Sequence, residues 1–245
     1  MNEGECHVGK ALIVSQDKIA TQQITTALQD HGLSVEVSVS APLALDRIAR
    51  HKFEAVIVDS AIDGGIARFL IKLRASASNR TAVAFALTTG QNATTSALSQ
   101  GFSFVLERPL TPESVIHTLR VAFGLIVRER RRYFRHPIEV PVALRRNGDV
   151  IYGRTLNVSE RGMAVRSSTP VSTGEKARAE FTLDHPDLHI TADLRVCWSK
   201  ENGDAGLSFT FLPHDLASEL QTWLGQKLEE KLPQAVVEKF RHPRT

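Results

Sequence analysis

Residues 128–137 read RERRRYFRHP, and the pattern of apolar residues changes at this stretch. Before it, continuous apolar runs alternate with segments of helical periodicity, whereas after it apolar and polar residues alternate one by one. Residues 128–135 contain five arginines and one glutamate, a local charge of +4, and the whole chain carries +3. The positive charge is therefore concentrated in one segment, which favours an anion-binding site over an extended nucleic-acid-binding surface.

The composition is that of an ordinary globular protein. A chain of 245 residues predicts two domains, and 42% hydrophobic with 23% charged residues is typical of soluble proteins. Cys6 and Cys197 lie far apart without C-x-x-C spacing, which indicates a reducing compartment and argues against a disulfide or zinc scaffold. The apolar runs are too short for a signal peptide or a membrane helix. We therefore expect a cytoplasmic protein without membrane insertion.

Five apolar runs of strand length occur before residue 110, and segments of helical periodicity separate them. The predicted strands are Ala11–Val14, Leu33–Val39, Ala55–Asp59, Ala82–Gly90 and Ser103–Leu106. The predicted helices cover 19–31, 41–51, 66–75, 94–100 and 112–130. Strands that are apolar throughout and alternate with helices are typical of a parallel sheet covered on both faces. Residues 8–127 are therefore predicted to form an α/β domain with a doubly wound, five-stranded parallel sheet.

Polar residues follow the last three of these strands. Asp59 ends the third strand, Thr88 lies near the end of the fourth, and Arg108-Pro109 follows the fifth. In such sheets the ligand-binding crevice lies at the carboxyl ends of the strands. In this arrangement, residues 8–127 resemble the response-regulator receiver domain. The resemblance implies that Asp59 occupies the phosphoacceptor position and that Thr88 supplies the hydroxyl that follows the phosphoryl group.

The sequence departs from the receiver pattern at the residues that would handle metal and phosphate. Ser15-Gln16 replaces the acidic pair that holds magnesium in that family, Asp17 lies one residue late, and Arg108 replaces a lysine. Magnesium prefers carboxylate and water oxygens in octahedral order, and phosphoryl transfer depends on the metal. We therefore expect Asp59 to be inactive as a phosphoacceptor and the domain to be a degenerate receiver that acts as an interaction module.

Beyond Pro137, apolar and polar residues alternate with a period of two. The predicted strands are Val140–Leu144, Val150–Leu156, Met163–Ser168, Ala177–Leu183, His189–Trp198 and Gly206–Leu212. Such short strands predict a small antiparallel six-stranded β-barrel, and an apolar stripe predicts a final helix at about 215–232. Residues 138–232 would form this second domain, with residues 128–137 as a hinge before it and residues 233–245 as a mobile tail after it.

The alternation also predicts which side chains face the barrel core. In HITADLRVCW, residues 189–198, Val196 and Trp198 fall on the apolar side and Cys197 falls on the other side. Trp198 and Trp223 are both predicted to be core residues.

Two short motifs lie at the start of the second half. Arg131 and Arg135 have R-x-x-x-R spacing, and an N-x-S-x-x-G sequence begins at Asn157. Their order, their spacing and their position relative to six barrel strands resemble the PilZ domain, the bacterial receptor for cyclic di-GMP, over about residues 128–230. The residues that this resemblance assigns to ligand binding are Arg131, Arg135, Asn157, Ser159 and Gly162.

The chemistry of these residue types fits such a ligand. Cyclic di-GMP carries phosphates and guanines, and a guanidinium pairs bidentately with either group and stacks on a purine. The amide of Asn157 can accept from the Watson–Crick edge of guanine. Ser159 offers a hydroxyl to a phosphate or to the turn, and Gly162 allows a positive φ or a close approach of backbone to ligand. Further candidate contacts are Arg130, Arg132 and Arg161.

Each motif also has a simpler explanation. Arginines are common at the C-terminal end of a helix, where they face the negative end of its macrodipole. Asn157 and Ser159 belong to the residue types that commonly form turns. We weigh these readings below the ligand-binding one, because the two motifs occur together.

No arrangement of catalytic or metal-binding residues stands out. His185 and His189 are four apart, but Pro186 lies between them in a predicted loop, so we assign no metal and no cofactor. We find no paired carboxylates, Ser/His/Asp order or Cys/His arrangement that would share one pocket. The protein is therefore predicted not to be an enzyme.

The predicted function is that of a cyclic di-GMP-binding effector in bacterial signalling. We expect the arginine arm to be mobile without ligand, because like charges repel and little apolar surface holds it. The ligand would draw Arg131 and Arg135 onto the barrel and change the interdomain geometry. It would thereby alter contacts with an unidentified protein partner, through the receiver-like domain. The sequence leaves a homodimer and the number of bound ligands undecided.

Two other functions are considered. A nucleic-acid-binding regulator could use the arginine arm, but the rest of the second half carries a net charge of −1 (+3 minus +4) and offers no extended basic track. A PilZ-like scaffold that has lost ligand binding is the second alternative. Because both motifs are present, we expect the ligand to bind.

Overall fold

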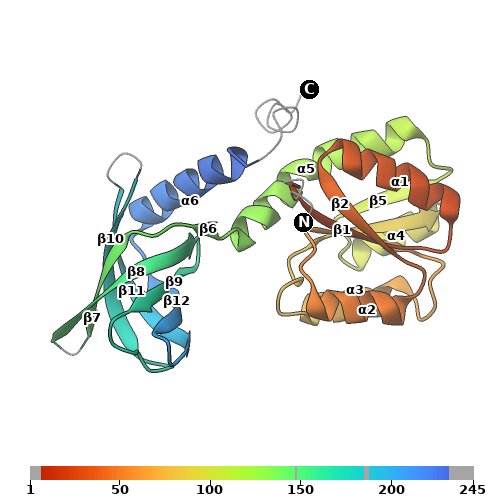
Figure 1. Cartoon of the computed structure of the whole chain (residues 1–245). Helices are drawn as coiled ribbons and strands as arrows, with labels where there is room; N and C mark the ends of the chain where they lie inside the picture. The colour runs from red at the N-terminus through yellow and green to blue at the C-terminus, as the bar shows by residue number, and fades with distance from the viewer. Residues whose placement is uncertain (1–6, 147, 185–187, 232–245) are drawn as a thin grey trace, which may run out of the picture. The chain divides into compact units, whose positions relative to one another are not determined.

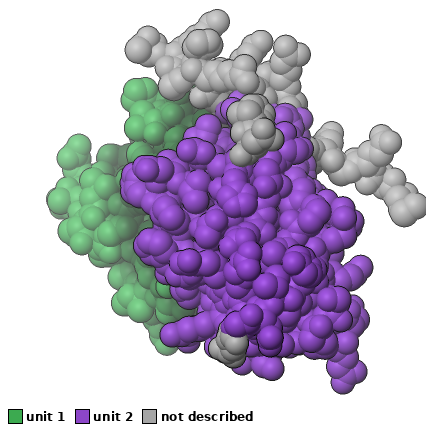
Figure 2. Space-filling view, turned by 90° about the vertical axis from the view of Figure 1, so that its left-hand side faces the viewer, with its two compact units in different colours: residues 1–130, 232–245 green, residues 131–231 purple. Residues whose placement is uncertain are grey.

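The computed structural model describes residues 7–146, 148–184 and 188–231. They divide into two compact units, and the division falls between Arg130 and Arg131, inside the arginine segment (Figure 2). No helix in these ranges is long and apolar enough to cross a membrane. The predicted tail, His185 and Cys6 lie outside the described residues.

The first unit contains the predicted five-stranded parallel sheet (Figure 1). The strand order is β2-β1-β3-β4-β5, and every neighbouring pair is parallel. The strands are β1 (Gly9–Val14), β2 (Leu33–Ser38), β3 (Ala55–Asp59), β4 (Val83–Thr89) and β5 (Phe104–Arg108). The predicted fold class is confirmed here, because β1, β3 and β4 are buried on both faces and such strands must be covered from both sides.

Helices cover the two faces of this sheet. The helices are α1 (Lys18–Asp30), α2 (Ala41–Arg50), α3 (Ile66–Ala75), α4 (Gln91–Ser99) and α5 (Pro112–Tyr133). The apolar sides of α1 and α5 pack on one face, and those of α2, α3 and α4 pack on the other. This arrangement leaves the carboxyl ends of the strands as the edge that carries the polar residues.

Helix α5 is longer than predicted and ends at Tyr133 instead of about Arg130. Its start is capped by a reciprocal pair of hydrogen bonds, because the N–H groups of Thr111 and Ser114 each donate to the other's hydroxyl at 3.2 Å. Arginine is a good helix former, so the basic segment continues the helix. The helix cannot continue past His136, because a residue before proline avoids the α region.

The second unit is an antiparallel barrel of six strands, with a short extra strand. The strands are β6 (His136–Pro137), β7 (Pro141–Arg146), β8 (Asp149–Ser159), β9 (Gly162–Ser167), β10 (Lys176–Leu183), β11 (Leu188–Ser199) and β12 (Asp204–Phe211). The order is β6-β8-β7-β10-β11-β12-β9, and a β8–β9 pairing closes the barrel. Helix α6 (His214–Glu229) contributes Leu220, Trp223, Leu224 and Leu228 to the barrel core.

Trp198 is not a core residue, contrary to the prediction from strict alternation. A β-bulge interrupts the pairing of β11 with β12 between Val196 and Trp198. One extra residue in a strand reverses the facing of every side chain that follows it. Val196 is therefore buried, whereas Trp198 is 43% exposed, and the prediction that Trp223 is buried is confirmed.

A tight hairpin joins β8 to β9 at the second motif. Ser159 pairs with Gly162, and its hydroxyl donates to the Gly162 carbonyl at 2.9 Å. A Cβ at Gly162, whose φ is +156°, would overlap the Leu207 carbonyl oxygen and lie 2.9 Å from Ser208 Cα in β12. Gly162 is thus required for the close approach of β9 to β12.

Gly162→Ala is expected to lower the free energy of unfolding of the barrel by about 2–4 kcal/mol, from backbone strain and overpacking together. Gly174→Ala is the matched control, since Gly174 has a φ of +87° but nothing within 4 Å of an added Cβ. The control should cost only about 1–2 kcal/mol for its left-handed conformation. Urea denaturation measures both, and equal losses would contradict the close-approach explanation.

Candidate ligand-binding site

The structure brings Arg135 and Asn157 together. Strand β6 pairs with β8 so that His136 faces Val158 and Pro137 faces Asn157. Arg135, immediately before β6, donates from Nη1 to Asn157 Oδ1 at 3.4 Å. Arg135 is exposed and Asn157 is half-buried, so both polar groups are accessible from solvent. One arginine of the first motif thus lies next to the first residue of the second.

Arg131 lies beside helix α6. Its side chain is half-buried beside α6, where a Cβ on Gly225 would be 4.0 Å from Arg131 Nη1. Arg131 and Asn157 both lie in the described part of the chain, and no hydrogen bond joins them.

Phe134 anchors the segment between the two motif arginines. It is 6% exposed and belongs to the core cluster of the barrel. The expectation that little apolar surface holds the arginine arm was therefore wrong. An aromatic side chain of this size fixes the segment against the barrel by burial, so Arg135 is held at a defined place.

Glu129 and Arg130 are tied to the first unit. Glu129 is 2% exposed and accepts from Lys52 Nζ at 2.5 Å and from Thr81 Oγ1 at 2.7 Å. Arg130 Nη1 lies 3.9 Å from Glu54 Oε1, and burial raises the pKa of the Glu54 carboxyl. Arg130, a further candidate contact, is therefore used within the first unit and is not brought to Asn157. Sequence reasoning missed the role of Glu129. The available signal was its position as the single acidic residue among the arginines.

The other motif residues shape the hairpin. Ser159 is 3% exposed and its hydroxyl already donates to the Gly162 carbonyl, and Gly162 packs against β12. Arg161 has an exposed side chain, and its carbonyl accepts from Phe209 N–H at 2.9 Å. Gly162 therefore permits a close approach to backbone of the same barrel. Arg132 is half-buried at the end of α5.

Aromatic and basic residues surround His136, next to Arg135. Its ring packs edge-on against Trp223, with 5.2 Å between ring centroids. Burial, and then the charges of Lys231 and Lys227, lower the pKa of His136 below its usual value. The imidazole is thus kept neutral, and the fixed positive charge here comes from arginine and lysine.

At the edge of the parallel sheet, Asp59 is bound by an arginine. Arg108 donates from Nη2 to Asp59 Oδ2 at 2.7 Å and from Nη1 to Oδ1 at 3.3 Å. Ser15 Oγ and Ala61 N–H donate to the same carboxylate at 2.6 and 3.0 Å. Burial by itself would raise the pKa of Asp59, but these hydrogen bonds outweigh it and lower the pKa.

The donors at this edge do not fit a magnesium site. Arg108 Nε also donates to Asp17 Oδ2 at 3.1 Å, so both nearby carboxylates are paired with one guanidinium. Asp17 in addition caps α1 by accepting from Ile19 N–H and Ala20 N–H. Across the described ranges, no group of three metal-ligating side chains is found. A fixed positive charge stands where a hard cation would need free carboxylate oxygens.

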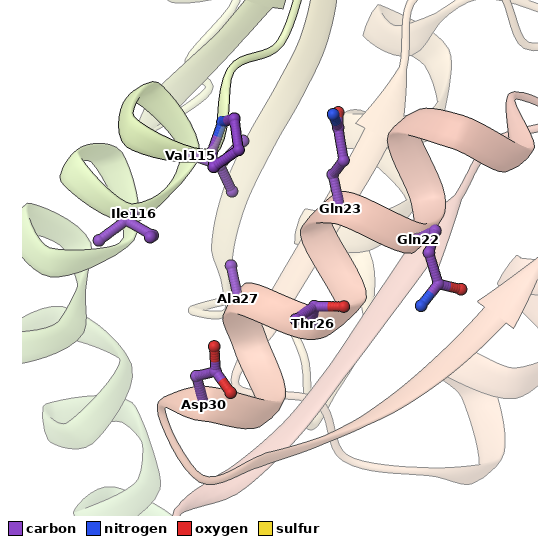
Figure 3. Close-up of a pocket in the computed structure, with 8 residues that line it drawn as sticks. Gln22, Gln23, Thr26, Ala27, Asp30, Val115 and Ile116 are labelled. Atoms are coloured by element: carbon purple, nitrogen blue, oxygen red, sulfur yellow. The ribbon is translucent and has the colours of Figure 1, made fainter.

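A cavity lies between α1 and α5 in the first unit (Figure 3). Its volume is about 240 Å³, and its lining residues are Gln22, Gln23, Thr26, Ala27, Asp30, Pro112, Val115 and Ile116. Ligand pockets usually measure about 300–1,000 Å³ and carry convergent polar groups. This cavity is smaller, and the sequence motifs do not point to it.

Comparisons with known proteins agree with the two-part architecture. The family model described as PilZ domain matches residues 129–226. Among solved structures, the first half is similar to the chemotaxis response regulator CheY4 of Vibrio cholerae, at 22% identity over 46% of this chain and 96% of that one, with a TM-score of 0.42. It is also similar to a receiver domain from Methylobacillus flagellatus, at 24% identity over 48% and 97%, with a TM-score of 0.42. A search of curated protein sequences gave no match.

The strand order 2-1-3-4-5 is the doubly wound order found in receiver proteins. The closed barrel with its following helix begins where the family match begins. The chain thus joins a doubly wound α/β domain to a barrel region, residues 129–226, that matches the PilZ domain family.

Proposed function

We propose that this protein is a non-enzymatic effector that binds cyclic di-GMP through its PilZ domain. The observation that carries the proposal is the juxtaposition of Arg135 and Asn157 on the barrel surface. PilZ domains are a receptor family for this second messenger, and both halves of the chain are of binding or signalling types. We assign the protein to the cytoplasm on its cysteine usage alone.

The two juxtaposed groups suit a guanine nucleotide. The five N–H donors of Arg135 can pair bidentately with a phosphate or with guanine O6 and N7. Asn157 Oδ1 accepts from Arg135 in the free protein and would accept from guanine N1–H or N2–H when the ligand displaces that contact. In this proposal Arg131 leaves α6 and supplies the second guanidinium. Ser159 and Gly162 serve mainly by holding the hairpin that presents Asn157.

Ligand capture is proposed to act on the junction between the units. Glu129 and Arg130 belong to the first unit by their ion pairs, and Arg131 follows them directly in α5. Drawing Arg131 toward a bound phosphate would therefore strain or reorganise the last turn of α5. The ligand shifts the arrangement only as far as its affinity differs between the two states. The resulting change would reach an unidentified protein partner through the receiver-like domain.

The receiver-like domain is proposed to act as an interaction module without phosphorylation. Asp59 is held by Arg108, which supplies permanently the positive charge that a phosphorylatable carboxylate receives from a metal ion. The guanidinium of Arg108 is part of the chain, so it cannot leave the site and exchange with solvent as a bound magnesium ion or water molecule does. The conformation of this edge should thus be independent of phosphodonors.

A nucleic-acid-binding regulator is the main alternative. The ion pair of Arg130 with Glu54 removes part of the charge that such a protein would use, and the second half outside the arginine segment is slightly acidic. DNA binding that weakens steeply with salt would support this alternative instead. A PilZ scaffold that no longer binds ligand would show no heat of binding with cyclic di-GMP.

Arg135→Ala and Arg131→Ala are each expected to weaken cyclic di-GMP binding about 30-fold or more. Each removes a charged partner from a desolvated phosphate or guanine, which costs about 2–4 kcal/mol. Asn157→Ala should weaken binding less. Isothermal titration calorimetry measures these affinities, and Arg145→Ala on β7 is the control because Arg145 pairs with Glu180 at 2.9 Å. Unchanged affinity in both motif variants would reject the site.

Small-angle scattering should differ between free and ligand-saturated protein, because the ligand is proposed to reorganise the junction. Arg131→Ala at saturating ligand should give a profile like that of the free protein. Identical profiles of wild-type protein with and without ligand would remove the interdomain mechanism and leave binding intact.

Acetyl phosphate with magnesium is expected to leave Asp59 unmodified, because Arg108 occupies both of its oxygens. Intact-mass spectrometry checks this, with Asp59→Asn as the control. A gain of one phosphoryl group in the wild type that is absent from the control would overturn the assignment.

A further inference from the structure

The short strand β6, which places Arg135, is weakly fixed by its own backbone. It consists of His136 and Pro137 only, which pair with Val158 and Asn157 of β8. Proline has no N–H, so His136 is the one residue of this strand that can donate to β8. Strands usually have about 3–10 residues, so this ladder is short. Side-chain packing must therefore supply much of what keeps β6 in place.

The ring of His136 supplies part of this packing. Burial alternates along the segment, with Phe134 buried, Arg135 exposed and His136 half-buried. The His136 ring contacts the rings of Phe134 and Trp223, with 6.2 and 5.2 Å between ring centroids. Trp223 is 3% exposed and belongs to the side of α6 that fills the barrel core. The imidazole therefore joins β6 to α6, while the arginine before it points outward.

Ring packing holds the imidazole at its buried side. His136 Nδ1 and Trp223 Nε1 are both buried, and neither has a hydrogen-bond partner in the described part of the chain. A protonated imidazole carries an N–H on both nitrogens, so Nδ1 would then be a charged donor without a partner. A buried charged group without a partner costs far more than a neutral one. The observed packing is therefore compatible with the neutral ring only.

The charged groups around the ring, taken together, oppose its protonation. They are Lys227, Glu230 and Lys231 in and just after α6, and Asp184 after β10. Burial lowers the pKa of His136 most, the two lysines lower it next, and the two acids raise it less. On β8 the residue paired with His136 is the apolar Val158, and Arg135 is exposed on the outer side. The surroundings as a whole favour the neutral ring.

From this geometry we infer that His136 is a positioning residue of the ligand site: its neutral ring, packed on Trp223, keeps β6 paired with β8 and so holds Arg135 in place. The inference rests on the proposed function and adds a control of the same site by protons. Protonation draws the ring away from Trp223 into solvent and releases β6 from α6. The ligand must then order this segment again, which costs affinity.

The response to pH follows from the two states of the ring. A histidine in solvent has a pKa of about 6.5, and the pKa of the packed His136 is lower. The released ring therefore binds a proton more tightly than the packed ring, so acidification favours release. The packed arrangement is fully stabilised above about pH 6.5 and loses that stabilisation as the pH falls toward the lowered pKa. Cyclic di-GMP has no group that titrates in this range, so the response comes from the protein.

Calorimetry with cyclic di-GMP tests the positioning role in the full chain. The wild type should lose about 3–10-fold in affinity from about pH 7.5 to about pH 5.5, because one pH unit below the pKa of the released ring is worth at most about 10-fold. His136→Phe keeps a ring that cannot be protonated, so it should bind more tightly than His136→Ala and lose no affinity on acidification. His189→Gln, at a β11 residue whose Nδ1 lies 3.1 Å from Thr182 Oγ1, is the matched control and should keep the wild-type response.

Tryptophan emission tests the packing of the ring without ligand. The two tryptophans of the chain, Trp198 and Trp223, both lie in the second unit, so their emission follows the unfolding of the barrel. The urea midpoint of the wild type should fall from about pH 7.5 to about pH 5.5 by more than that of His136→Phe, because only the wild type gains a proton at this position.

The outcomes separate the positioning role from the receptor function. A loss of affinity on acidification that occurs in the wild type and in His189→Gln, and is absent from His136→Phe, supports the positioning role. Equal pH responses of the wild type and His136→Phe, in affinity or in urea midpoint, overturn it and leave the receptor function standing, as does an affinity that rises on acidification. Absence of binding at both pH values, with the barrel folded by tryptophan emission, overturns both.

Discussion

The candidate site depends on the pairing of a two-residue strand with the long strand β8. Strand β6 follows Arg135, and Phe134 before it is buried in the barrel core. These two constraints hold Arg135 beside Asn157, although the two residues are 22 positions apart. A slip of one residue in this pairing would turn the neighbouring side chains to the opposite face and separate the groups. The position of Arg135 beside Asn157 is therefore a consequence of strand register.

Ion pairing determines which residues of the arginine segment are held by the first unit and which are left for the second. Glu129 and Arg130 are bound to buried or half-buried partners of the first unit, and Arg131 and Arg135 remain for the barrel. A comparable use of charge occurs at the sheet edge, where Arg108 holds Asp59 and Asp17 together. Removing one partner of a partly buried ion pair lowers the stability of the protein strongly, because the remaining charge stays desolvated. Arginine thus has a structural role in the first unit, whereas Arg135 stays exposed on the second.

The fold was largely readable from hydrophobic periodicity. Uninterrupted apolar strands such as Ala55–Asp59 predicted the parallel sheet, and period-two alternation predicted the barrel. The sequence predictions were wrong at two places, where other factors outweighed the local pattern of apolar residues. Helix α5 extends to Tyr133 because arginines favour helix and Glu129 anchors it, and Trp198 turns outward because a bulge resets the alternation. The bulge leaves no mark in the local pattern, and the anchor is marked only by one acidic residue among the arginines.

The types of residues at the site, guanidinium and carboxamide groups in two short motifs, were evident from the chain as written. The arginine cluster indicated an anion, and the resemblance to the PilZ domain implied a ligand with phosphates and guanines, which these side chains suit. Which arginine meets Asn157, and that Ser159 and Gly162 serve the hairpin, followed only from the folded barrel. The reason is physical: side-chain types and local periodicity are properties of neighbouring residues, whereas register, bulges and ion pairs join residues distant in the chain.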